Sequence, residues 1–293
     1  MVDLHTPVMT ASGTAGFGDE LSAYGDLSML GALVTKSLSV GPWAGNSAPR
    51  VTEVVAGMLN SVGLQGPGIP AWLSADLPAA RAAGAQVVAS IWGTSTDQFG
   101  QASQMLQGQD LLAVEINVSC PNVEDRSSMF GHSAKGTAAV VDACRGALPL
   151  WVKLSPNVPD LVSIASAAVE AGAAALVLTN TLLGMSLDAV SGRPTLGNGG
   201  GGLSGPAVHP VAVRAVYECR KALPEIPIIG VGGIRSGVEA LEFLHAGAQA
   251  VEVGTATFRD PRAPWKIARQ LDRALLRAGH LSTREAIGYA HRS

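Results

Sequence analysis

Short runs of consecutive hydrophobic residues recur along the chain and alternate with longer segments in which hydrophobic residues return every three or four positions. The short runs fit buried β-strands, and the longer segments fit amphipathic helices. This alternation is typical of βα units arranged around a parallel sheet. Eight strands are predicted, at residues 8–11, 32–35, 86–91, 112–116, 150–153, 175–179, 226–230 and 250–253.

Helices are predicted between several of these strands, at residues 97–107, 158–171, 207–223, 237–245 and 264–278. Three helix-to-strand turns have similar sequences, AGAQ at 83–86, AGAAA at 171–175 and AGAQA at 246–250. Glycine after a helix favours the left-handed conformation that ends it. Eight units with such regular turns predict an α/β fold, a (β/α)8 TIM barrel. Because barrels of this kind commonly take about 250 residues, we expect residues 1–293 to form a single domain.

Charge and hydropathy argue against several classes of partner. The chain has 20 basic and 23 acidic residues, so it lacks the basic surface that nucleic-acid binding usually requires. The N-terminal residues MVDLHTPVM do not form a signal peptide, and no apolar run approaches the roughly 20 residues of a membrane span. We therefore expect a cytoplasmic protein without a nucleic-acid or membrane partner.

The three cysteines, Cys120, Cys144 and Cys219, show no CxxC spacing. This argues against a disulfide framework, an iron–sulfur cluster or a Cys-rich zinc site, and we expect no metal in this chain. Cys144 and Cys219 lie in helical patterns and are predicted to fill space in the core or on the surface.

Cys120 belongs to a different context, the stretch EINVSCPN at 115–122. A buried strand ends there in a cluster of polar side chains. Cys120 is the one group in the cluster that exchanges a proton near neutral pH, whereas the amides of Asn117 and Asn122 only donate and accept hydrogen bonds. Cys120 is therefore a candidate catalytic residue, with a buried structural cysteine as the alternative.

Residues that follow the strands form the active face of a (β/α)8 barrel. Gly230–Ile234 and Gly254-Thr255 follow the last two strands, where backbone N–H groups often bind phosphate; simple tight turns are the alternative. Lys36 and Lys153 end two other strands. Each fits an anionic ligand or the electron-rich edge of a flavin, although pairing with a carboxylate is the default for an interior lysine.

Three long connections, 41–68, 122–136 and 182–205, are rich in Gly, Asn, Ser and Pro. Connections this long in a compact barrel are usually binding loops or lids. The second begins two residues after Cys120, so we expect it to close over a substrate and exclude water.

Nearly the whole chain resembles the dihydroorotate dehydrogenases of class 1, most closely the class 1B catalytic subunit. The resemblance rests on nine motifs in order: VMTASGTAGFG (8–18), TKS (35–37), GMLNSVGLQGPG (57–68), EINVSCPN (115–122), VKLSPNV (152–158), TNTLLGM (179–185), GGLSGPAVHPVAVR (201–214), IIGVGGI (228–234) and VGTA (253–256). It implies an FMN-containing barrel that oxidises dihydroorotate to orotate in pyrimidine (UMP) biosynthesis. Cys120 would be the base that removes the C5 proton while hydride passes to flavin N5.

The resemblance also implies roles for the other site residues. The positions that match the family's substrate site are Lys36, Asn60, Gly63, Leu64, Asn117, Asn122, Asn180 and Thr181. The positions that match its FMN site are Ala11, Ser12, Gly13, Lys36, Ser37, Asn117, Lys153, Gly205, Gly232, Gly233, Gly254 and Thr255. The chain departs from the class 1B pattern at Gly66, where Asn is common, at His209, where Lys is frequent, and after Asn122, where paired glycines are lacking.

Class 1B membership implies a homodimer and a second subunit that carries FAD and an iron–sulfur cluster and passes electrons to NAD. Several alternatives remain open at this point. They are a class 1A-like enzyme that uses fumarate, a barrel similar to dihydropyrimidine dehydrogenase or tRNA dihydrouridine synthase, and a flavin-binding barrel without catalytic activity.

Overall fold

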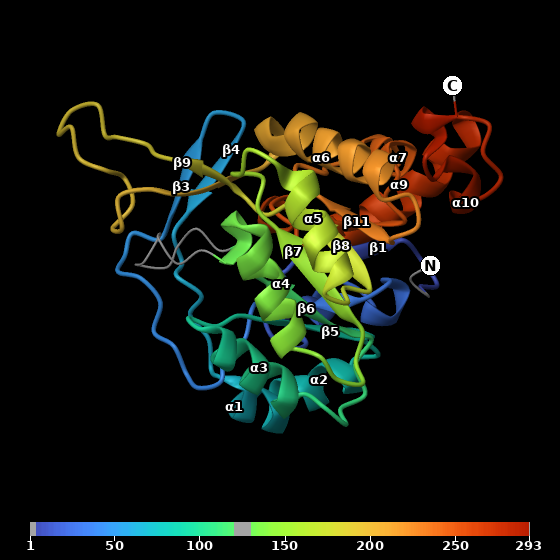
Figure 1. Cartoon of the computed structure of the whole chain (residues 1–293). Helices are drawn as coiled ribbons and strands as arrows, with labels where there is room; N and C mark the ends of the chain where they lie inside the picture. The colour runs from blue at the N-terminus through green and yellow to red at the C-terminus, as the bar shows by residue number, and fades with distance from the viewer. Residues whose placement is uncertain (1–3, 120–129, 293) are drawn as a thin grey trace.

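The computed structural model describes residues 4–119 and 130–292, so Cys120 and Asn122 lie outside the described residues. Eight parallel strands form its central sheet, in the order β1-β12-β11-β8-β7-β6-β5-β2 (Figure 1). The strands are β1 (Val8–Thr10), β2 (Leu33–Val34), β5 (Val87–Ile91), β6 (Ala113–Asn117), β7 (Leu150–Leu154), β8 (Ala175–Leu178), β11 (Ile228–Val231) and β12 (Ala250–Val253). Each lies within about two residues of a predicted strand, which confirms the barrel prediction.

The two ends of the sheet, β1 and β2, meet and close the barrel. The N–H of Gly31 donates to the carbonyl of Val8 at 2.8 Å, and the N–H of Thr10 donates to the carbonyl of Ala32 at 3.2 Å. Closure leaves the central sheet without a free edge strand. It also points the carboxyl ends of all eight strands toward one mouth, where their following residues can gather.

Helices surround the barrel (Figure 1). They are α1 (Ile69–Ser74), α2 (Asp76–Ala82), α3 (Thr96–Met105), α4 (Ala134–Ala143), α5 (Leu161–Glu170), α6 (His209–Ala222), α7 (Gly237–Ala246) and α9 (Ala263–Arg277). The five predicted helices are all present. Helix α5 begins later than predicted because Asp160 caps it, accepting a hydrogen bond from the N–H of Ser163. The predicted left-handed glycines are confirmed, with φ of +82° at Gly84, +110° at Gly172 and +117° at Gly247.

Shorter helical elements complete the described part. They are α8 (Ala256–Arg259), α10 (Thr283–Ala286) and the 3-10 helices η1 (Glu20–Ala23), η2 (Leu27–Met29), η4 (Phe130–His132), η5 (Pro206–Val208) and η6 (Tyr289–His291). Within the described ranges, no helix has the length and apolar character needed to cross a membrane.

A second, antiparallel sheet lies beyond the carboxyl ends of the barrel strands, at the left of Figure 1. Its strands are β3 (Val51–Val54), β4 (Gly57–Asn60), β10 (Gly201–Ser204) and β9 (Leu182–Gly184), in the order β3-β4-β10-β9. Two of the long connections, 41–68 and 182–205, were expected to be loops and instead contain these strands. The strands within these connections were not predicted, because glycine-rich segments such as Gly201–Ser204 lack a hydrophobic alternation and pair only with distant segments.

The hydrophobic core has two parts. One lies between the sheet and the helices and includes Cys144 and Cys219, both fully buried as predicted for space-filling residues. Burial raises the pKa of each thiol to about 12, so both are inert thiols at neutral pH. The other part fills the barrel interior with small and branched side chains around Trp151. This interior layer packs the barrel beneath its mouth.

Candidate active site

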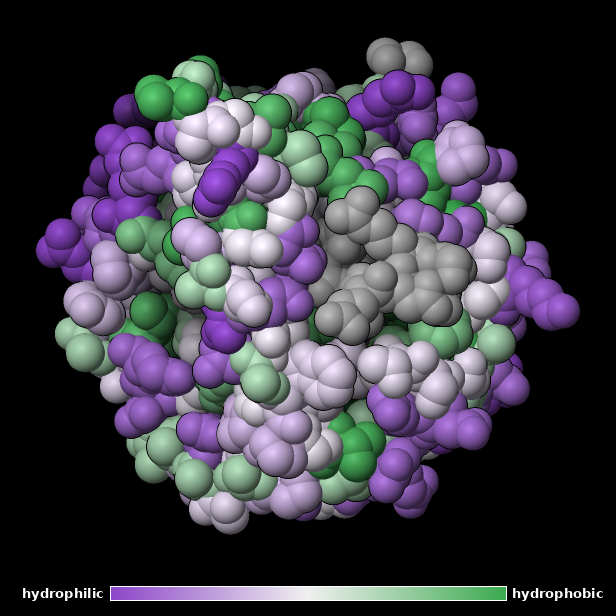
Figure 2. All heavy atoms as spheres, turned by 90° about the vertical axis from the view of Figure 1, so that its left-hand side faces the viewer, coloured by the Kyte–Doolittle hydropathy of each residue, from purple (hydrophilic) through white to green (hydrophobic). Residues whose placement is uncertain are grey.

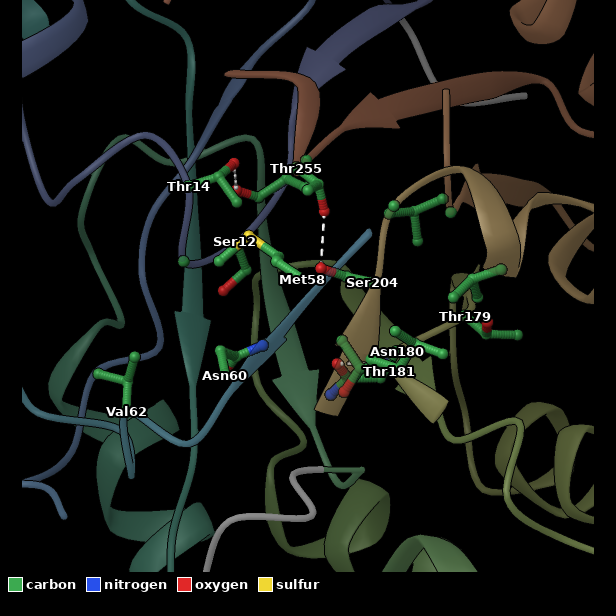
Figure 3. Close-up of a pocket in the computed structure, with 18 of the residues that line it drawn as sticks. Ser12, Thr14, Met58, Asn60, Val62, Thr179, Asn180, Thr181, Ser204 and Thr255 are labelled. Carbon is green, nitrogen blue, oxygen red and sulfur yellow. Dashed lines mark hydrogen bonds between the residues drawn. The ribbon is translucent and has the colours of Figure 1, made fainter. Parts of the chain in front are cut away.

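A cavity of about 190 Å³ opens at the mouth of the barrel, beneath the second sheet (Figure 3). Every predicted site residue that the structure describes lines it. These residues are Ala11, Ser12, Gly13, Lys36, Ser37, Asn60, Gly63, Leu64, Asn117, Lys153, Asn180, Thr181, Gly205, Gly232, Gly233, Gly254 and Thr255. The structure thus brings together residues from all nine motifs, although the role of each one stays a prediction.

The two kinds of predicted site residue lie on different sides of the cavity. Strands β6 and β12 are four places apart in a closed ring of eight, so Asn117 at the end of β6 lies across the mouth from Gly254 after β12. Figure 3 shows Thr255 and Ser204 on one side, with Asn60, Asn180 and Thr181 on the other. One side therefore offers backbone and hydroxyl groups, and the other offers amides.

The amide side is held together by hydrogen bonds around Ser119. Asn180 Nδ2 donates to Ser119 Oγ at 2.9 Å, to the Ser119 carbonyl at 3.3 Å and to Asn117 Oδ1 at 3.3 Å. Asn117 Nδ2 in turn donates to Ser37 Oγ at 3.0 Å. Because Ser119 directly precedes Cys120, these contacts hold the backbone in place immediately before the predicted base.

Lys36 contributes a positive charge to the cavity. It forms no ion pair with a carboxylate in the described part of the chain, and its ammonium lies 5.4 Å from the centre of the Phe17 ring. Partial burial, with a smaller effect from the charge of Arg50, lowers the pKa of Lys36. An ammonium without a carboxylate partner attracts an anionic ligand, because such a ligand offsets the cost of removing the charge from water.

Lys153 has the opposite environment. Its Nζ lies 2.8 Å from Glu252 Oε2 and 3.5 Å from Glu115 Oε2, and all three side chains are buried. Burial lowers the pKa of Lys153, but the two carboxylates more than offset this effect, so its pKa is raised and it stays charged. Lys153 therefore pairs with carboxylates, as expected by default for an interior lysine, and it also lines the cavity.

The glycine side of the cavity is closely packed. Gly233 has a φ of +68°, and an added Cβ would lie 2.7 Å from the carbonyl oxygen of Gly205 and 2.8 Å from His209 Cβ. Any side chain at this position would force apart the ends of β10 and β11. Thr255 Oγ1 donates to Ser204 Oγ at 2.8 Å and so joins the end of β12 to β10.

The family model described as Dihydroorotate dehydrogenase matches residues 1–275 of the chain. The chain belongs to the dihydroorotate dehydrogenase family. Curated relatives agree. A Geobacter metallireducens protein named "Dihydroorotate dehydrogenase B (NAD(+)), catalytic subunit" is 46% identical over 290 residues, covering 98% of this chain and 95% of the relative. A Desulforudis audaxviator protein of the same name is 48% identical over 293 residues, covering 99% and 95%.

Among solved structures, the dihydroorotate dehydrogenase of Eimeria tenella in complex with ferulenol has the same fold. Its TM-score is 0.78 at 22% identity, and the match covers 99% of this chain and 86% of that one. These findings confirm that the chain is a dehydrogenase of this family and that it is most like the class 1B catalytic subunits. They also argue against the alternative of a barrel similar to dihydropyrimidine dehydrogenase or tRNA dihydrouridine synthase.

Several other residues line the cavity of this dihydroorotate dehydrogenase and were not predicted as site residues from the sequence. They are Val51, Met58, Val62, Thr179, Leu203, Ser204, Val208, Val231 and Phe258. Thr179 was counted as the last residue of a strand. Its Oγ1 is buried and has no hydrogen-bond partner among the described residues, so it is free to bind a ligand. Glu115 and Glu252 were also missed, although an acidic residue inside an apolar strand is an available signal.

Two of the three departures from the class 1B pattern lie in the described part. A Cβ added at Gly66 would lie 3.2 Å from the Phe17 ring, so a side chain at this position would require that ring to shift slightly. His209 bonds to the Gly232 carbonyl at 3.2 Å and to Glu242 Oε2 at 2.9 Å. The imidazole thus supports the glycine turn after β11. No group of three His, Cys, Asp or Glu side chains suited to a metal occurs among the described residues.

Proposed function

We propose that this chain uses FMN to oxidise (S)-dihydroorotate to orotate in de novo pyrimidine biosynthesis. The observation that carries the proposal is the position of Lys36, a cation without a carboxylate partner in the described chain, beside an amide cluster in the mouth of a dihydroorotate dehydrogenase barrel. An ammonium suits a carboxylate, and amides suit a cyclic diamide that both donates and accepts hydrogen bonds.

The residues of the cavity fit FMN. Thr179 Oγ1 is an orphaned buried hydroxyl at the cavity wall, and a Cβ added at Gly13 would meet no atom within 4 Å, so the wall leaves room there. We assign Ala11, Ser12, Gly13, Ser37 and Lys153 to the flavin ring. The glycines at the ends of β10, β11 and β12, with Thr255, are assigned to the ribityl phosphate. When bound, FMN supplies the acceptor for the hydride that the substrate loses.

The substrate is assigned to the amide side. Lys36 would bind its carboxylate, and the amides of Asn60, Asn117 and Asn180 would bind its ring, with Asn122, Gly63, Leu64 and Thr181 completing the set. Amides impose strong discrimination, because a buried amide that a wrong ligand leaves without a partner is costly. Asn180 has a second task, since it holds Ser119 in place.

Cys120 is assigned as the base that takes the proton from C5 of the substrate. Only a group with an accessible deprotonated state can do this, and the neighbouring amides have none. A thiol at its ordinary pKa of about 8.5 is mostly protonated at pH 7, so the site would work faster as the thiolate forms.

Electrons would leave through a second subunit. The relatives are named catalytic subunits of an NAD(+) enzyme, which favours a partner that carries FAD and an iron–sulfur cluster over direct use of fumarate. A homodimer in the cytoplasm remains the predicted state. Figure 2 shows that hydrophobic and hydrophilic residues are interspersed on the face above the cavity mouth. Fumarate reduction by the isolated chain would favour the class 1A-like alternative.

The test is an anaerobic titration of the purified yellow protein with dihydroorotate, followed by the absorbance of the oxidised flavin. We expect the band to bleach in the wild type, to bleach far more slowly in Cys120→Ala, and to bleach normally in the control Cys219→Ala. A protein that binds FMN and stays yellow, with or without an added partner subunit, would contradict the assignment of substrate. It would leave a flavin-binding barrel without this activity.

A further inference from the structure

Directly below the cavity, the barrel interior contains a charged cluster that the proposed function does not use in full. It consists of Glu115 on β6, Lys153 on β7 and Glu252 on β12. Both carboxylates are 0% exposed, and neither lines the cavity. Only Lys153 reaches from the cluster to the cavity floor, so the carboxylates act on a bound ligand through it.

The hydrogen bonds of the two carboxylates are unequal. Glu115 accepts from Ser90 Oγ at 2.9 Å on one oxygen and from Lys153 at 3.5 Å on the other. Glu252 accepts from Lys153 at 2.8 Å through Oε2, whereas its Oε1 has no partner in the described part of the protein. A buried carboxylate with one bare oxygen is costly, because that oxygen has lost its water and gained no donor.

A proton on Glu252 removes this cost. With both glutamates ionised, the cluster would have one positive and two negative charges in the interior. With Glu252 protonated, the charges of Lys153 and Glu115 balance, and the two glutamates no longer repel each other. Burial raises the pKa of Glu252 to about 8, Lys153 opposes the rise and Glu115 adds to it.

Among the described residues, no titratable group other than Lys153 and Glu115 acts on Glu252. Its neighbours in the strand register are Met9 of β1 and Val231 of β11, both apolar, and the charged groups that face it are Glu115 and Lys153. The protonation of Glu252 is therefore coupled to these two residues and to whatever charge lies in the cavity above them.

We propose that Glu252 is a positioning residue, which holds the ammonium of Lys153 at the cavity floor and carries the one proton that keeps the buried cluster neutral. The consequence for FMN rests on the proposed function. In a neutral cluster, the ammonium of Lys153 lies nearest the cavity and stabilises the negative charge that a flavin gains on reduction. Loss of the proton leaves a net negative charge below the ring, which opposes reduction.

A chain of hydroxyl groups links the cluster to the amide side of the cavity. Ser90 Oγ donates to Glu115, so Ser37 Oγ, 3.0 Å from Ser90 Oγ, must donate to Ser90. Asn117 Nδ2 then donates to Ser37. Every hydroxyl in the chain points its hydrogen toward Glu115, so the chain connects the buried cluster to the amide side of the cavity.

The first test needs no cofactor. Infrared spectra of the FMN-free protein should show the carbonyl band of a protonated carboxylic acid at pH 7, and the band should fade as the pH rises to about 10. We expect Glu252→Gln to lack the band. Glu115→Gln should lack it too, because removal of the repelling carboxylate lets Glu252 ionise beside Lys153. The control Glu170→Gln, an exposed glutamate of α5, should keep it. A wild-type spectrum without the band would overturn the proposal.

The second test measures the midpoint potential of bound FMN by electrochemical titration, without dihydroorotate. Between pH 7 and about 9.5, we expect the wild-type potential to fall further than that of Glu252→Gln. A tenfold difference in the ratio of oxidised to reduced flavin corresponds to about 30 mV for two electrons. Parallel curves would contradict the proposal, and a folded Glu170→Gln variant should follow the wild type.

The two proposals fail in different ways. A chain that does not bind FMN, or whose FMN is not bleached by dihydroorotate, would overturn the proposed function, while the infrared test of Glu252 would still stand. A chain that is bleached normally, but has parallel potential curves and no acid band, would retain the enzyme and remove the role of Glu252.

Discussion

The hydroxyl of Thr255 donates a hydrogen bond of 2.8 Å to the hydroxyl of Ser204 (Figure 3). The two residues are 51 positions apart, and their bond ties the last barrel strand to the sheet that covers the mouth. It is therefore a direct link between the scaffold and its added layer, on the side of the cavity assigned to phosphate.

Replacement of Thr255 by Val should weaken FMN binding about 3- to 10-fold, the effect of one lost hydrogen bond. Ser204→Ala is the matched variant, because it removes the same bond and leaves the Thr255 hydroxyl in place. A larger loss in Thr255→Val than in Ser204→Ala would indicate direct contact with FMN. Fluorescence titration of the FMN-free protein measures both, and unchanged binding in both would contradict the assignment.

Asn180→Asp should raise the KM for dihydroorotate at least about tenfold. The new carboxylate would face Asn117 Oδ1 and the Ser119 carbonyl, which now accept from the Asn180 amide, and it would repel an anionic substrate. Steady-state kinetics give the result, with Asn198→Asp, an exposed residue, as the control. An unchanged KM would remove Asn180 from the substrate site.

Lys153→Met should lower the free energy of unfolding by about 3–5 kcal/mol, because it leaves the buried side chains of Glu115 and Glu252 without the cation that they share. Urea denaturation measures the change. Lys221→Met, at the exposed end of α6, is the matched control and should change stability by less than about 0.5 kcal/mol. Equal stability of the two variants would show that the buried pairs do not hold the barrel interior together.

The pKa of Glu252 also predicts how stability depends on pH. Its folded value of about 8 lies above the ordinary 4.5, so its contribution is fully present below pH 4.5 and is lost as pH rises toward 8. The wild type should therefore lose stability relative to Glu252→Gln between pH 5 and 8, by up to about 1.4 kcal/mol per pH unit. Denaturation curves across this window test it, and a constant difference between the two proteins would contradict it.

The rate of flavin reduction by dihydroorotate should rise with pH as the Cys120 thiolate forms, with a midpoint near 8.5. Cys120→Ala should lower this rate by roughly 10²- to 10⁴-fold, the usual contribution of a general base. Stopped-flow absorbance under anaerobic conditions follows both. A flat wild-type rate from about pH 6 to 9 would rule out an ordinary thiol as the base.

Much of the candidate site was predictable because a parallel barrel gathers the ends of its strands. Asn117, Lys153 and Gly254 end or follow three apolar runs, and their meeting needs only the barrel and the direction of its strands. The assignment of individual roles came from the resemblance to a family. For Cys120 and Asn122, which lie outside the described residues, that assignment stays a prediction.

The sequence by itself determined the local features of the chain. Apolar runs specify buried strands, and glycines such as Gly172 and Gly247 end helices through a left-handed conformation that other residues adopt at a cost. These features depend on neighbours within a few positions. For that reason they could be read from the order of residues alone.

Only the tertiary structure decided which distant groups meet. Asn60 pairs with Gly202 across β4 and β10, and Lys153 meets Glu252, 99 positions away. The sequence around these residues does not identify their partners. Backbone hydrogen bonds are alike in all strands, and a charge attracts any opposite charge. Strand order and register in the folded barrel decide which residues become partners. They bring Lys153 to Glu252 in the barrel interior, and they place the second sheet over the cavity.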